Sequence, residues 1–174
     1  MLTNSLVSSK ILKNGKEGVM VCSFTGHRKI ENEHMDTLPA LLSRAIRYCY
    51  DEGCREFLCG GAVGFDTLAA REVILFKLTH PDVSLRLLLP CQDQDNSWSA
   101  RQRSAYAHVI ENADYIEYAE DFYTPGCMQK RNRLLAERCD ILVAYLGRSR
   151  SGAGQTVRIA TGLGKRVYNL FNHC

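Results

Sequence analysis

The stretch Cys59-Gly60-Gly61-Ala62-Val63-Gly64-Phe65-Asp66-Thr67 carries most of the information about the fold of this chain. A short apolar strand, predicted over residues 56–59, leads into three glycines within five residues, and a helical pattern opens at Asp66 or Thr67. Glycine lets the backbone approach an oxyanion closely, and the free N–H groups of a first helical turn point towards it. The layout is typical of an anion-binding strand–loop–helix turn, whose predicted contacts are Gly60, Gly61 and Gly64.

Two other interpretations of this stretch stay open. Gly-Gly is a common tight turn, and Asp66 is a good N-cap whether or not a ligand is bound. The stretch matches neither the GxGxxG dinucleotide pattern nor the Gly-Lys-Ser/Thr phosphate loop. Whether the turn belongs to a ligand site therefore depends on the residues at the other strand ends.

Strands and helices alternate on both sides of the turn. Short apolar runs predict strands over residues 19–24, 56–59, 84–89, 114–118, 141–145 and 166–170. Amphipathic or capped segments predict helices over about 36–52, 66–78, 97–112, 128–138 and 155–163, with Ser97 as the N-cap of the third. This alternation predicts an α/β fold: a single Rossmann-like, doubly wound, mostly parallel sheet of about six strands with helices on both faces.

Length and composition indicate one domain, over residues 18–174, behind a loosely ordered N-terminal extension of residues 1–17. The net charge of +3 is too small to indicate a polyanion-binding surface by itself, and no apolar run reaches the ~18 residues of a membrane span. The eight cysteines show no metal-ligand spacing, so we expect no metal site and a reducing, cytoplasmic environment. Cys91 and Cys127 are placed in loops beside the site, without an assigned role.

The ends of four strands carry residues suited to an anionic ligand, and in doubly wound sheets ligands bind at these ends. After the first strand, Thr25 and Gly26 offer a hydroxyl and close backbone approach, while His27 and Arg28 offer hydrogen-bond donors. The other predicted contacts are Arg131 and Asn132 after the fourth strand, and Gly152, Gly154 and Thr156 in a second small-residue turn after the fifth. Alternatives remain for three of these residues: Arg28 can be a solvated charge, His27 an ordinary loop histidine, and Arg131 a helix-surface residue.

Several motifs recur together in one known family. They are Phe24-Thr25-Gly26-His27-Arg28, residues 60–70, Leu89-Pro90-Cys91-Gln92-Asp93-Gln94, Trp98, and Tyr123-Thr124-Pro125-Gly126-Cys127-Met128 with Arg131-Asn132. From about Val19 to Leu170 the chain resembles a YpsA-like protein of the SLOG superfamily. The resemblance implies a bacterial Rossmann-like protein that acts on or senses nucleotide-derived ligands. It implies the LOG phosphoribohydrolases, DprA and molybdenum-cofactor carriers as relatives. It also adds Gln92 to the predicted site. This branch has no settled reaction, and some members are linked to cell division.

One departure from the relatives bears on catalysis. The hydrolase relatives keep a catalytic glutamate pair after their last glycine turn, whereas Val157 and Arg158 follow that turn here. The general acid/base for N-glycosidic cleavage is therefore missing from that position. Asp66 is the remaining candidate, with Asp93 or Asp95 as outside choices, and its place at a helix N-terminus predicts lowered basicity.

These observations favour binding or sensing of a nucleotide, ADP-ribose or NAD-like molecule, with a regulatory role in cell division or stress. The alternative is a hydrolase that cleaves a nucleoside monophosphate or an NAD-like substrate, so enzyme status stays open. Acidic residues argue against nucleic acid as the partner because they interleave with the aromatic side chains that would stack on bases. The aromatic residues are Trp98, Tyr106, Tyr118 and Tyr123, and the acidic ones are Asp93, Asp95, Glu117, Glu120 and Asp121. A homo-oligomer is a further option.

Two structural hypotheses follow. Arg28 and Arg131 are expected to contact the ligand from opposite sides, because a doubly wound order is taken to bring the first and fourth strands together. Gly61→Val is expected to push a branched side chain into the space where a phosphate approaches.

Overall fold

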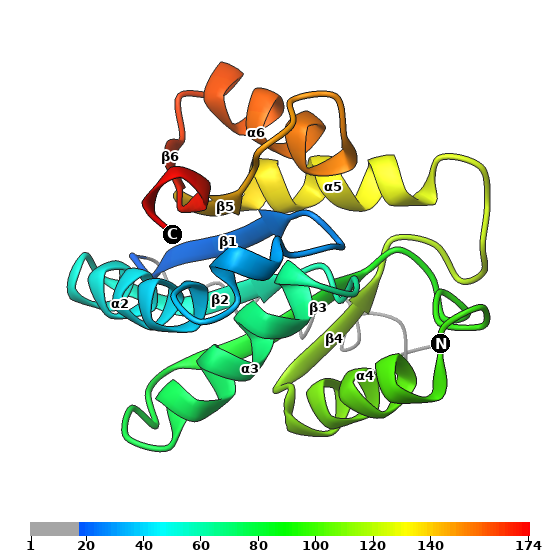
Figure 1. Ribbon diagram of the computed structural model, residues 1–174, viewed down its shortest axis with the longest axis horizontal. Helices are drawn as coiled ribbons and strands as arrows, with labels where there is room; N and C mark the ends of the chain where they lie inside the picture. The colour runs from blue at the N-terminus through cyan, green and yellow to red at the C-terminus, as the bar shows by residue number, and fades with distance from the viewer. Residues whose placement is uncertain (1–17) are drawn as a thin grey trace, which may run out of the picture.

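The computed structural model describes residues 18–174 and shows one six-stranded parallel sheet between two layers of helices (Figure 1). The predicted extension, residues 1–17, lies outside the described residues. The strands are β1 (Met20–Gly26), β2 (Cys54–Cys59), β3 (Ser84–Leu89), β4 (Tyr115–Tyr118), β5 (Ile141–Tyr145) and β6 (Arg166–Asn169). The helices are η1 (Asn32–His34), α2 (Leu38–Asp51), α3 (Phe65–Lys77), α4 (Ala100–Asn112), α5 (Cys127–Arg138), α6 (Gly152–Gly162) and η2 (Phe171–His173).

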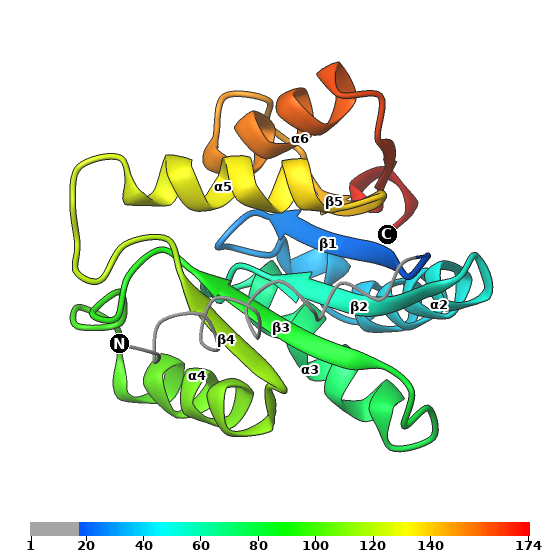
Figure 2. The same ribbon diagram turned by 180° about the vertical axis from the view of Figure 1, so that it is seen from behind.

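The two helical layers are unequal. Helices α2, α3 and α4 cover one face of the sheet, and α5 and α6 lie together on the other (Figures 1 and 2). All strand pairs in the described part are parallel, which confirms the predicted Rossmann-like architecture. None of the helices within residues 18–174 has both the length and the apolar character needed to cross a membrane.

The main core lies under α2, α3 and α4, where alternate strand residues and the apolar helix faces interlock. Phe24 and Phe57 stack in it with ring centroids 6.1 Å apart, and Leu87 beside them is fully buried. The opposite face carries small apolar clusters, one of which joins Leu58, Leu88 and Leu135. Its other strand positions hold ion pairs such as Arg86–Glu56 at 3.1 Å, so part of that face is polar.

The strand order places the switch point between β1 and β5. The order is β4-β3-β2-β1-β5-β6, because the first three crossovers add strands on one side of β1 and α5 then returns the chain to the other side. The expectation that the first and fourth strands lie together is therefore wrong: β4 is an edge strand, and β2 and β3 separate it from β1.

The starts of α4 and α6 differ most from their predicted positions, by three residues each, and side-chain caps explain both. Helix α4 begins after Ser99 rather than Ser97, because Ser99 and Gln102 form a reciprocal capping box. Helix α6 begins at Gly152 rather than Gln155, because the Ser151 hydroxyl accepts the Gly154 N–H at 3.0 Å.

Candidate functional site

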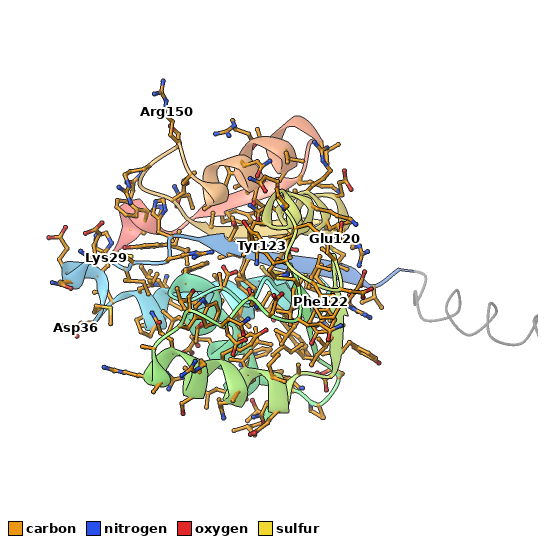
Figure 3. All side chains as sticks on the ribbon, turned by 90° about the vertical axis from the view of Figure 1, so that its right-hand side faces the viewer. Lys29, Asp36, Glu120, Phe122, Tyr123 and Arg150 are labelled. Atoms are coloured by element: carbon orange, nitrogen blue, oxygen red, sulfur yellow. The ribbon has the colours of Figure 1, made fainter. Side chains whose placement is uncertain are left out.

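A cavity of about 390 Å³ opens at the carboxyl edge of the sheet, where β1 and β5 diverge. Figure 3 looks onto this edge. The loop after β1, the glycine turn before α3, the middle of α5 and the start of α6 form its walls. Eight of the predicted site residues line it: Thr25, Gly26, His27, Arg28, Asp66, Arg131, Asn132 and Gly152. The sequence pattern thus brings four separate loops and helix starts to one place, while ligand contact by these residues stays a prediction.

The cavity is strongly positive. Among the described residues, the cations Arg28, Lys29, Arg131 and Arg148 line it, against one carboxylate, that of Asp66. Within residues 18–174, no ion pair involves Arg28, Lys29 or Arg148. Unpaired guanidinium and ammonium groups that face a shared hollow attract an anion and can bind it through charge-assisted hydrogen bonds.

The first turn of α6 adds to this positive field. Ser151, Gly152 and Ala153 line the cavity, and a helix N-terminus presents free N–H groups and a partial positive charge. Gly154 and Thr156, predicted as contacts, do not line it. A Cβ on Gly154 would collide with the Ser149 carbonyl oxygen, and the Thr156 hydroxyl donates to the Gly152 carbonyl at 3.2 Å. Both residues shape the helix start.

The three glycines of the central turn serve the protein's own packing rather than the cavity. Gly60 leaves room for the guanidinium of Arg131, which donates to the Gly60 carbonyl oxygen. Gly64, with φ +81°, lies directly against the backbone of Arg28. A Cβ on Gly61 would strike Leu89 in the core, so the expectation that Gly61→Val fills a phosphate's space is wrong.

Asp66 is buried and paired, which corrects two expectations. The N-cap of α3 is Gly64, and Asp66 is the second residue of the helix. Its carboxylate accepts the Ala62 N–H at 3.3 Å and lies 3.8 Å from Arg131 Nη1. Burial raises the pKa of Asp66, although Arg131 and the Ala62 N–H oppose this effect. Desolvation is therefore the largest effect on this carboxyl, and its pKa is raised where the sequence predicted lowered basicity.

Arg131 and Asn132 connect three elements and are both buried, so the alternative of a helix-surface arginine is wrong. Besides its bond to Gly60, Arg131 donates from Nε to Asn132 Oδ1 at 2.9 Å. Asn132 donates in turn to the Gly152 carbonyl at 3.3 Å. The pair therefore joins α5 to the glycine turn and to the start of α6.

His27 acts as an acceptor, in contrast to the expectation that it donates to the ligand. Its Nε2 accepts the N–H groups of Gly147 at 2.9 Å and Arg148 at 3.1 Å. These contacts require an unprotonated Nε2, with the proton on Nδ1. Burial, followed by the Arg148 charge, lowers the pKa of His27, while Glu31 opposes this. The ring therefore holds the loop that carries Arg148.

Gln92 and the outside acidic candidates lie elsewhere. Gln92 is exposed after β3, two strands away from β1, and its N–H donates to the Asp121 carbonyl at 3.2 Å. Neither Asp93 nor Asp95 lines the cavity. Gln94 is the buried side chain of that segment and donates to Tyr106 Oη at 2.8 Å behind the glycine turn.

Sequence reasoning missed the cations Lys29 and Arg148. Arg148 follows the carboxyl end of β5 by three residues, the same signal that selected Arg28 after β1, so it was available in the sequence. Lys29 directly follows Arg28 and is shown at this edge in Figure 3. Arg150, in the same loop as Arg148, projects into solvent away from the domain (Figure 3).

The fold and the cavity define a doubly wound, Rossmann-like domain with a cationic hollow at its switch point. Residues 22–158 match the family model YpsA, described as the YspA SLOG family, and the chain belongs to this family. The SPbeta prophage-derived protein YoqJ of Bacillus subtilis is 27% identical over 156 residues, covering 82% of this chain and 87% of YoqJ. A UPF0398 protein of Halalkalibacterium halodurans is 32% identical over 98 residues, covering 55% of this chain and 52% of that protein.

Two solved structures of DNA processing protein A share the fold. The Helicobacter pylori protein, described as binding single-stranded DNA, aligns with a TM-score of 0.60 and 20% identity over 85% of this chain and 63% of its own. The Streptococcus pneumoniae protein aligns with a TM-score of 0.63 and 15% identity over 87% of this chain and 50% of its own. The chain thus spans between half and two thirds of these neighbours, and at such identities the likeness concerns the fold.

Proposed function

We propose that the protein binds a nucleotide or nucleotide-derived molecule through its phosphate in the switch-point cavity. The observation that carries this proposal is the charge of the cavity, which has four cationic side chains against one carboxylate. Its volume, about 390 Å³, falls within the range of ~300–1,000 Å³ typical of small-molecule sites. The proposed contacts are Thr25, Gly26, Arg28, Lys29, Arg131, Asn132, Arg148 and Gly152.

The family and the fold favour a nucleotide over other anions. Doubly wound sheets bind nucleotides at their switch points, with the phosphate at a helix N-terminus, and the start of α6 lies at this place. We propose AMP, ADP-ribose or NAD-like compounds as ligands of a sensing protein. A sensing role accords with Val157 and Arg158, which stand after the last glycine turn in place of a glutamate pair. Regulation of cell division or of a stress response in the bacterial cytoplasm is the corresponding cellular proposal.

Nucleic acid is less disfavoured as a partner than the acidic residues of the sequence indicated. None of the acidic residues that were expected beside the site lines the cavity. Two of the aromatic residues pack elsewhere, since Trp98 and Tyr106 contact each other with centroids 5.1 Å apart. Glu120, Phe122 and Tyr123 lie together on the loop between β4 and α5 (Figure 3). A nucleic-acid strand is therefore among the nucleotide ligands to be tested.

A hydrolase remains the second candidate because Asp66 lines the cavity and burial raises its pKa. Its carboxylate is already engaged by Arg131 and the Ala62 N–H. We therefore assign it a structural and charge-balancing role in preference to that of a general base. We expect binding without turnover of AMP, NAD or ADP-ribose. Chromatography of the free base after incubation checks this, and turnover would favour the hydrolase.

The binding proposal is tested by titration calorimetry with AMP, ADP-ribose and NAD. Arg148→Gln should weaken binding by about 1.5–3 kcal/mol, the size of a hydrogen bond to a charged group, or roughly ten- to a hundredfold. Arg150→Gln is the matched control, since it removes the same charge from the same loop outside the cavity. Equal affinities in the two variants would contradict the proposal, as would the absence of any binding by the wild type.

A further inference from the structure

A second hollow, of about 280 Å³, shares one lining residue, Arg28, with the cavity. It lies between the segment around η1 and the first turns of α2, α3 and α4, and we call it the groove. Arg28 lines both hollows. Its backbone is fixed from behind, because Gly64 packs on it and the Phe65 N–H donates to the His27 carbonyl at 3.2 Å. Because Arg28 lines both hollows, one ligand that occupied both would contact it.

The floor of the groove is apolar. Leu38 is fully buried there, and Val63 and Leu68 are partly buried beside it. Met35 forms an edge with 54% of its surface exposed. Apolar side chains with a flexible, polarisable methionine beside them suit the face of an aromatic ring.

The rim of the groove is cationic. Arg28, Arg71 and Arg101 line it. Within residues 18–174, no carboxylate lines the groove and no ion pair involves any of the three arginines. Guanidinium groups bind phosphates through paired hydrogen bonds and also stack on base planes. Three of them around an apolar floor fit a base that is flanked by phosphates.

We infer that the groove holds the base of a second nucleotide, so that the ligand is single-stranded nucleic acid whose backbone crosses Arg28 from the cavity. This inference rests on the proposed function and specifies its ligand class. A mononucleotide bound in the cavity would leave the groove empty. A nucleic-acid strand would occupy both hollows, because its phosphates bind the arginines and its unstacked base covers the apolar floor.

Titration calorimetry with pT, pTpT, pTpTpT and a ten-residue oligothymidylate tests the inference. In the wild type, affinity should rise about tenfold or more from one nucleotide to two, as a further charge-assisted contact and a stacked base are added. Replacing the second base by an abasic site should remove much of this gain. Affinity that is independent of strand length, while pT still binds, would overturn the inference and leave the proposed function intact.

Arg101→Gln isolates the groove, and Arg103→Gln on the same helix is its matched control because Arg103 does not line the groove. Arg101→Gln should leave pT binding unchanged, abolish most of the gain from a second nucleotide, and lower the slope of log K against log salt by about 0.7. Equal effects of the two variants would overturn the inference. NAD that binds as tightly as pTpT, with the same dependence on Arg101, would also overturn it and assign the groove to a dinucleotide. Failure of every nucleotide to bind would contradict the proposed function itself.

Discussion

At the scale of single residues, His27 shows how a neutral side chain can prepare a cationic site. It lies in the cavity wall, yet its Nε2 is occupied by the N–H groups of Gly147 and Arg148. The ring packs edge-on against Phe171, with centroids 6.4 Å apart, which fixes its orientation. His27 is therefore a positioning residue for Arg148.

This role predicts a definite pH dependence. The folded pKa of His27 is lowered, and a histidine in an unfolded chain titrates near ~6.5. Its contribution to stability is thus fully present above about pH 6.5 and is lost as the pH falls through the folded pKa. Affinity for a phosphodiester should decline in the same window, because a protonated Nε2 cannot accept the Arg148 N–H. A cationic histidine that touched the anion would give the opposite trend.

Urea unfolding and binding, each measured between about pH 5 and pH 8, check this prediction. His27→Gln is the reference, since a side-chain amide can accept a hydrogen bond but does not titrate. On acidification the wild type should lose both stability and affinity relative to His27→Gln, because only the wild-type side chain becomes protonated. A difference that stays constant across this range would contradict the positioning role.

At the scale of elements, the most informative discrepancy between sequence and structure is the start of α6. The predicted bounds of β3 and β5 match the structure to the residue, because both strands are rich in apolar residues and bounded by turn residues. Helix α6 was predicted to start three residues late, because the glycines of its first turn have low intrinsic helix propensity. The Ser151 cap and the contact of Gly154 with Ser149 are specific local contacts, which residue propensities alone do not contain.

The two ends of α6 therefore respond differently to the same substitution. In Gly154→Ala the added Cβ would collide with the Ser149 carbonyl, so the loop that carries Arg148 must move, at a cost of about 1–3 kcal/mol. In Gly162→Ala the Cβ meets no atom of residues 18–174 within 4 Å, and stability should rise by about 0.4–1 kcal/mol. Urea unfolding midpoints measure both. Equal shifts of the same sign would show that the contact between Gly154 and Ser149 contributes nothing.

At the scale of the whole molecule, the alternation of strands and helices predicted the parallel sheet but left the strand order open. The order depends on the side of β1 to which α5 returns the chain, and that is decided by tertiary packing. The same return explains why Arg131 reaches the cavity although β4 lies at the sheet edge. The prediction that Arg28 and Arg131 share a site rests on the wrong assumption that β1 and β4 are neighbours. Both residues nevertheless line one cavity.

Arg131 also links the two helical layers. It belongs to α5 on one face of the sheet and contacts Asp66 of α3 on the other, across the carboxyl edge (Figure 1). Both side chains are almost fully buried. Removing one partner of a buried ion pair leaves the other charge uncompensated, which costs about 3–5 kcal/mol. Arg131→Met should therefore lower the free energy of unfolding at neutral pH by about this amount.

The pH dependence of this loss identifies its cause. Burial raises the folded pKa of Asp66, and Arg131 opposes the rise, so Arg131→Met should raise that pKa further. A buried carboxylate destabilises the fold only while it is ionised, so the deficit should be largest above its folded pKa and shrink on acidification. Arg131→Met/Asp66→Asn should recover most of the stability at neutral pH, because the amide oxygen still accepts the Ala62 N–H and no buried charge remains. Urea unfolding of the three proteins from about pH 4 to pH 8 measures both effects. A deficit that is independent of pH and persists in the double variant would show that Arg131 stabilises the domain through packing and its bond to the Gly60 carbonyl instead.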